Sequence, residues 1–99
     1  MVNRDGRREK RMRFEASVTL IRAQEPGVSE SALTQNVSPM GTRVLVKSSM
    51  APDQLLYLTS PTVGVRASVR VIYCQPLANG QFAVGLRVQG HPVNWAGFP

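Results

Sequence analysis

The chain has 99 residues, which is enough for one domain with one modest core and excludes a two-domain enzyme with a cleft between its lobes. Hydrophobic residues make up 42% and charged residues 18%, a balance typical of a folded chain. Lys and Arg number 12 against 6 Asp and Glu. The resulting net charge of +6 favours an anionic partner, such as a nucleotide, a nucleic acid or a membrane surface.

Several classes of protein are excluded by what the composition lacks. The single cysteine, Cys74, cannot form an internal disulfide, so we expect a reducing, cytoplasmic location. One Cys and one His are too few for a metal site, and we expect no cofactor. No apolar run reaches the roughly 18 residues that a membrane span needs, so we expect none.

The first 13 residues differ from the rest of the chain. They hold six of the basic residues and show no apolar periodicity, so we expect a flexible basic arm or a turn of helix over residues 1–13. The basic residues of this arm are Arg4, Arg7, Arg8, Lys10, Arg11 and Arg13.

Beyond the arm, apolar and polar residues alternate with a period of two, which predicts half-buried antiparallel strands. The clearest run places Val69, Val71 and Tyr73 on one face and Arg70 on the other. Turn residues separate the runs: Glu25-Pro26-Gly27 after the first strand, and Asn79-Gly80 as the turn of a hairpin. The predicted strands are 15–22, 32–37, 42–48, 54–59, 65–75 and 81–88.

These short strands predict an all-β fold, a small six-stranded antiparallel β-barrel over residues 14–90. We expect residues 91–99 to fold back as a tail that caps the core, since Trp95 would be costly to leave exposed.

Catalysis is not expected. The six acidic residues are scattered, so no pair of carboxylates is placed for acid–base work. The one histidine, His91, lies in the tail beside Pro92. The sequence therefore predicts a binding protein rather than an enzyme.

Two motifs have the chemistry of ligand binding. Arg7 and Arg11 are four residues apart, and on a compact bend their guanidinium groups would face the same side, where they match phosphate oxygens and stack on purines. Asn36 and Ser38 are two apart, so an extended strand points both toward one face. Gly41 allows a close approach to the backbone. Alone, each motif also fits a solvated tail or an ordinary turn.

Together, R-x-x-x-R followed by N-x-S-x-x-G in a small all-β chain resembles the PilZ domain family. The segment from Val69 to Val88 is similar to the closing hairpin of that family, so the resemblance covers roughly residues 7–88. It implies a six-stranded barrel that receives cyclic di-GMP, a bacterial second messenger, without catalysis. It also implies that the signal passes to a downstream protein by contact.

Carried over to this chain, the resemblance makes Arg7 and Arg11 the motif arginines and Arg8 an adjacent clamp on phosphates and guanines. Asn36, Ser38 and Gly41 would form the half of the site that belongs to the barrel.

The arginine register is open. Measured back from the first predicted strand, Arg13 stands where the second motif arginine is expected, and Glu9 then occupies its partner's position. Two other hypotheses follow from the arm: a PilZ-like adaptor that binds a protein but no nucleotide, and a general binder of nucleic acids or other polyanions. The nucleic-acid hypothesis is disfavoured because the predicted strand positions of the aromatic residues form no obvious stacking platform.

Overall fold

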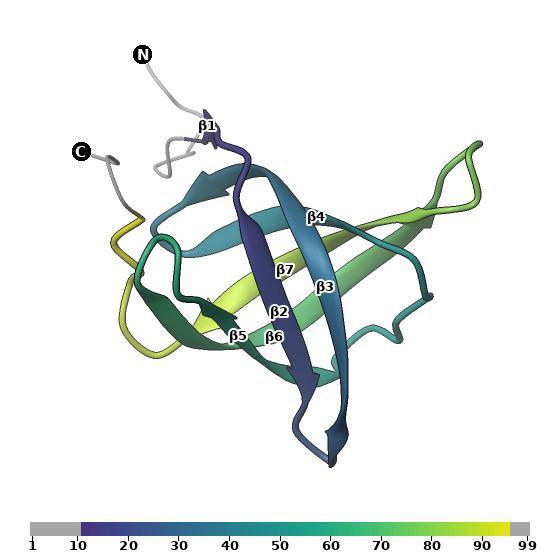
Figure 1. Cartoon of the computed structure of the whole chain (residues 1–99), viewed down its shortest axis with the longest axis horizontal. Coiled ribbons are helices and arrows are strands. Elements are labelled where there is room, and N and C mark those ends of the chain that lie inside the picture. Colours follow the sequence, from purple (N-terminus) through teal and green to yellow (C-terminus); the bar gives the residue numbers. More distant parts are fainter. Residues whose placement is uncertain (1–10, 96–99) are drawn as a thin grey trace.

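A computed structural model describes residues 11–95, and all secondary-structure elements in this range are β-strands (Figure 1). All pairings are antiparallel, and β3 pairs with both β2 and β4, which closes β2 to β7 into a barrel. The predicted six-stranded barrel is confirmed, with one additional strand, β1. The strands are β1 (Met12–Arg13), β2 (Ser17–Arg22), β3 (Glu25–Ser38), β4 (Gly41–Val46), β5 (Leu55–Ser60), β6 (Val65–Pro76) and β7 (Phe82–Gln89).

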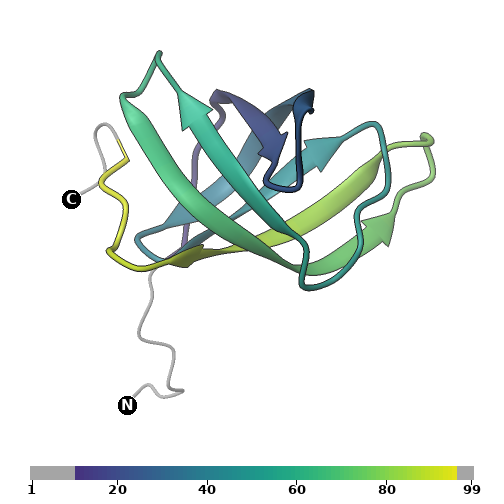
Figure 2. The same ribbon diagram turned by 90° about the horizontal axis from the view of Figure 1, so that it is seen from below.

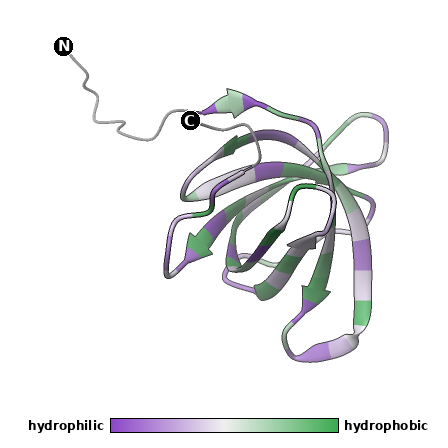
Figure 3. Ribbon diagram, turned by 60° about the vertical axis from the view of Figure 1, so that its left-hand side comes forward, coloured by the Kyte–Doolittle hydropathy of each residue, from purple (hydrophilic) through white to green (hydrophobic). Residues whose placement is uncertain are grey.

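The core is built from the inward half of each alternating strand. Hydrophobic and hydrophilic residues alternate along the ribbons (Figure 3). In β2, for example, Val18 and Leu20 point inward, and both side chains are buried. Further members of the core include Val37, Val44, Val46, Leu56, Leu58, Val69, Val71, Val84, Leu86 and Val88.

β1 shows that the sheet begins inside the predicted arm. Met12 and Arg13 were placed in the arm, yet they pair with Val37 and Asn36 of β3. Between β1 and β2 the chain stays on the same edge of β3, because the Phe14 amide donates to the Gln35 carbonyl at 3.2 Å. β1 therefore continues the line of β2, and backbone pairing on this edge outweighs the lack of apolar alternation.

β3 is longer than predicted, and the expected turn at Glu25-Pro26-Gly27 is wrong. The chain turns at residues 23–24, and β3 starts at Glu25. The register between β2 and β3 jumps from the pair Ile21 and Ser29 to the pair Arg22 and Glu25. Residues 26–28 lie in this irregularity without partners on β2, which is where a proline, lacking an amide hydrogen, is tolerated in a sheet.

A bulge in β6 overturns the predicted orientation of Tyr73. Val71 pairs with Leu86 and Tyr73 pairs with Gly85, so Ile72 is an extra residue in β6. The extra residue reverses the alternation beyond it. Tyr73 is therefore 40% exposed on the outer face rather than inward beside Val71, and Cys74 packs against the core instead.

The β6–β7 hairpin predicted at Asn79-Gly80 is confirmed, and it projects from one end of the barrel (Figure 2). Gly80 has φ +86°, a conformation that favours glycine. The Asn79 side-chain oxygen accepts a hydrogen bond from the Gln81 amide at 3.0 Å.

The last described residues pack on the β3–β4 turn. Trp95 is 1% exposed, and its indole N–H donates to the Ser38 carbonyl at 3.0 Å. Its ring meets that of Phe14 edge-on, with centroids 6.3 Å apart. The Val93 amide donates to the Pro39 carbonyl at 2.7 Å. The indole thus fills the space between the start of β2 and the turn.

Trp95→Ala is expected to lower the free energy of unfolding by about 3–5 kcal/mol, because it removes a buried ring and leaves a cavity. Urea unfolding at equilibrium measures this change. Tyr57→Ala is the matched control, since Tyr57 is 44% exposed. A loss for Trp95→Ala no larger than that for Tyr57→Ala would contradict the packing role of the indole.

Candidate functional site

The strand register forms two parallel rows of residues across the barrel wall, and the exposed polar side chains of both rows project outward. Antiparallel partners project to the same side of a sheet, so each row can be followed from strand to strand. The first row runs across β1, β3, β4, β7 and β6 and contains Arg13, Asn36, Arg43, Gly85 and Tyr73. The second row runs across β3, β4, β7 and β6 and contains Ser38, Gly41, Arg87 and Arg70.

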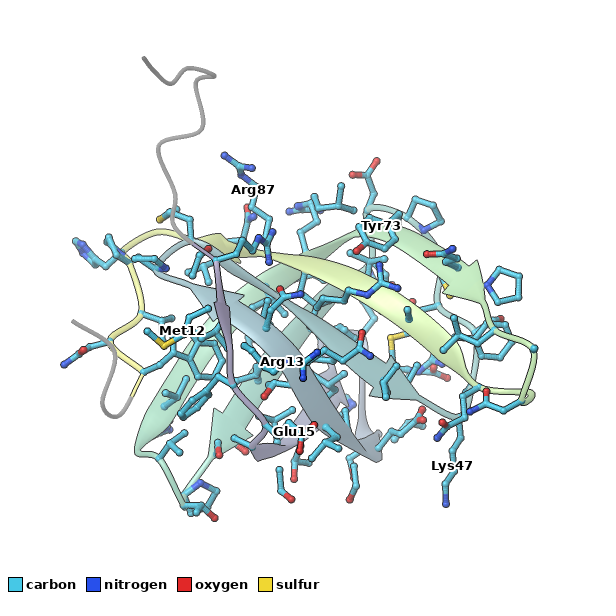
Figure 4. The ribbon with its side chains drawn as sticks, turned by 90° about the horizontal axis from the view of Figure 1, so that it is seen from above. Met12, Arg13, Glu15, Lys47, Tyr73 and Arg87 are labelled. Carbon is cyan, nitrogen blue, oxygen red and sulfur yellow. The ribbon has the colours of Figure 1, made fainter. Side chains whose placement is uncertain are left out.

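Figure 4 shows three members of the rows in one view. Arg13 projects from β1, and Arg87 and Tyr73 lie on the outer side of β7 and β6 (Figure 4). Lys47, which directly follows β4, lies well away from them in the same view. Arg13 and Arg43 thus lie in the row that carries Asn36, and Arg87 and Arg70 lie in the row beside it.

Arg11 meets the N-x-S-x-x-G segment directly. Its Nη1 atom donates to the Asn36 Oδ1 atom at 2.8 Å. Its Nη2 atom lies 3.8 Å from the position that a Cβ on Gly41 would occupy. The structure thus brings Arg11, Asn36 and Gly41 together, whereas Arg7 and Arg8 lie outside the described residues.

Ser38 occupies the buried part of this segment. It is 0% exposed, and its hydroxyl donates to the Gly41 carbonyl at 3.5 Å. The turn that it begins is held from two sides, by the Trp95 indole and by the Val88 amide, which donates to the Met40 carbonyl at 2.8 Å. A ligand on the outer face would therefore meet Asn36 and Gly41 on a turn whose shape is already fixed.

Gly41 is required by the fold as well as by any ligand. A Cβ at this position would stand 2.7 Å from the Leu86 carbonyl oxygen, which is backbone and cannot move aside cheaply. Sequence reasoning assigned Gly41 to ligand approach, and the structure adds the close contact between β4 and β7.

The arginines of the two rows have no carboxylate partner among residues 11–95. Arg70 and Arg87 stand directly opposite each other on β6 and β7, and like charges in such a pair are destabilising. This face is therefore suited to phosphate oxygens, which accept charge-assisted hydrogen bonds from guanidinium groups.

Sequence reasoning missed Arg43 and Arg87 as members of this face. The alternation predicts that Arg87 points outward, but only the pairing of β4 with β7 places it beside Gly41. Nothing in the local sequence of either arginine signals that neighbourhood.

Other site classes find no support in the described part of the chain. Among residues 11–95, no three His, Cys, Asp or Glu side chains are grouped so that they could hold a metal ion. The same residues include no helix long and apolar enough to cross a membrane.

Comparison with known proteins gives a likeness in structure. No family model and no curated protein matches the chain. A solved structure of MrkH from K. pneumoniae in complex with c-di-GMP is similar, with a TM-score of 0.66 and 15% sequence identity. The match covers 90% of this chain and 46% of MrkH, so the chain spans less than half the length of that protein. The likeness shows a shared fold.

Gly41→Ala is expected to destabilise the protein by about 1–3 kcal/mol, because the added methyl group collides with the Leu86 carbonyl. Thermal or urea unfolding measures the loss. Gly27→Ala is the matched control, because a Cβ at Gly27 meets nothing within 4 Å. Equal stability of the two variants would show that β4 and β7 are not in close contact at Gly41.

Proposed function

We propose that the chain is a non-catalytic, PilZ-like receptor domain for cyclic di-GMP, which binds on the outer face where Arg11 meets Asn36. The observation that carries the proposal is the hydrogen bond from Arg11 to Asn36 beside Gly41, on a face whose arginines have no carboxylate partner within the described residues 11–95. The structural likeness to a c-di-GMP complex of MrkH adds support through the shared fold.

The ligand and the face have matching chemistry. Cyclic di-GMP carries two phosphates and two guanines, and guanidinium groups bind phosphate oxygens and stack on purines. In the proposed complex, Arg11 turns from Asn36 to a phosphate, and the Asn36 amide is released to bond a guanine edge. Gly41 lets the ligand approach the backbone, and Ser38 keeps the turn in shape.

The remaining arginines of the motif complete the clamp. Arg7 and Arg8 are proposed to close over the ligand from the arm. Arg13 is the alternative to Arg11 as the inner motif arginine, and it is the register partner of Asn36 on β1. Closure of the arm would change the surface near the N-terminus, and a downstream protein would read that change.

Calorimetry with the full chain at physiological salt tests this function. Cyclic di-GMP is expected to bind, while GTP and a short single-stranded DNA are not. Arg11→Ala and Asn36→Ala are each expected to weaken binding roughly tenfold or more, because charge-assisted hydrogen bonds contribute about 1.5–3 kcal/mol. Arg66→Ala, which removes the same charge from a part of β6 outside the two rows, is the control and should bind as the wild type does.

The other hypotheses predict different results. Binding to DNA in place of cyclic di-GMP, with a log–log salt slope of about −0.9 per phosphate neutralised, would support a polyanion binder. A folded chain that binds no nucleotide would support the protein adaptor. Binding that neither Arg11→Ala nor Asn36→Ala weakens would place the ligand elsewhere. In that case Arg13→Ala would test the second arginine register.

A further inference from the structure

Arg43, in the middle of the first row, is held by side chains from two other strands. Its Nε atom donates to the Gln35 Oε1 atom at 2.8 Å, and its Nη1 atom donates to the Tyr73 hydroxyl at 3.0 Å. Its Nη2 atom lies 3.5 Å from the Gln75 Oε1 atom. The guanidinium carbon stands 5.9 Å from the centre of the Tyr73 ring. Three neutral side chains thus fix a charged, planar group on an outer face.

Two bulges build this arrangement. In β3, Thr34 pairs with Val44 and Asn36 pairs with Arg43, so Gln35 is the extra residue. In β6, Ile72 is the extra residue, and it turns Tyr73 to the outside. Bulges are concentrated beside functional sites, where they redirect side chains. Here both of them direct a side chain to Arg43.

Gly85 makes room for the tyrosine ring. A Cβ built at Gly85 would collide with three carbon atoms of the Tyr73 ring, so the ring covers the backbone of β7 at this point. Tyr73 nevertheless remains 40% exposed. One side of the ring rests on β7, and the ring presents a flat aromatic surface beside a fixed guanidinium group.

The pair also lies within reach of the proposed ligand. Asn36 is the register partner of Arg43, and Arg43 is the register partner of Gly85. Two strand spacings, or about 10 Å, therefore separate Asn36 from the position that Tyr73 covers.

We infer that Arg43 and Tyr73 form a stacking platform for a purine base of the nucleotide that is bound at Asn36. This inference rests on the proposed function and adds to it a second contact surface on β4 and β6. The neighbouring side chains already occupy donors of the Arg43 guanidinium, so its flat face and the Tyr73 ring are what the pair offers to a ligand. Bases stack on aromatic rings and on guanidinium planes.

A purely structural role for Tyr73 makes a different prediction. An aromatic ring over a cross-strand glycine also stabilises a sheet without any ligand. In that case, removing the ring would lower the stability of the free protein and leave the affinity unchanged. A platform requires the affinity to fall.

Calorimetry with cyclic di-GMP on variants of the full chain separates the two roles. Tyr73→Leu is expected to weaken binding roughly tenfold, since stacking contributes about that factor per base. Tyr73→Phe keeps the ring and should retain most of the affinity. Arg43→Lys keeps the charge but loses the plane, and it should weaken binding several-fold. Tyr57→Leu, at an exposed tyrosine on β5, is the control and should bind as the wild type does.

The NMR spectrum of the bound nucleotide adds a measurement that a change in protein stability alone does not alter. In the wild-type complex, the ring current of Tyr73 should shift the guanine H8 resonance upfield. At saturation with Tyr73→Leu, that shift should be lost.

The inference is overturned if Tyr73→Leu and Arg43→Lys bind within twofold of the wild type while Arg11→Ala and Asn36→Ala weaken binding. If the wild-type chain binds no cyclic di-GMP, the proposed function itself fails, and the platform fails with it.

Discussion

The closure of the barrel depends on β3, because this one strand pairs with three others. Along one edge, β3 pairs with β2 up to Leu33. Along its other edge, β3 pairs with β4 from Leu33 onward. An open sheet of this size would expose two edges, and the pairing of β3 with β4 from Leu33 onward joins them. Beyond Leu33, β1 replaces β2 along the first edge of β3 and pairs with Asn36 and Val37. Asn36 therefore lies between β1 and β4, and the candidate site forms where β3 has changed its neighbours.

The alternation of residues predicted most of this fold, and the bulges account for the errors. Strong period-two runs and the Asn79-Gly80 turn have local causes, so a sequence shows them. The extra residues of the two bulges on the outer face are Gln35 and Ile72, and neither is a glycine or a proline that would mark a bulge. A single unmarked residue in β6 was enough to put Tyr73 on the wrong face of the predicted sheet.

The candidate site likewise contains residues that the sequence identifies and residues that only the strand register brings together. Asn36 and Gly41 lie in one short motif, and its spacing identifies them without a structure. Arg43 and Tyr73 come from segments 30 residues apart and meet only through the register of β4, β7 and β6. The burial of Ser38 accompanies a contact with Trp95, which is 57 residues away along the chain. Long-range pairing of this kind leaves no local pattern, so a motif gives the centre of a site more readily than its surroundings.

The contact between Trp95 and Ser38 also gives the protein an internal optical probe. Trp95 is the only tryptophan in the chain, and its indole N–H is bonded to the backbone of the turn that carries the N-x-S-x-x-G motif. Indole emission responds to the polarity around the ring and to the hydrogen bond of its N–H group. Under excitation that tyrosine does not absorb, the fluorescence of the unlabelled protein therefore arises from a single chromophore whose surroundings include the motif, and its wavelength and intensity respond to the conformation of that turn.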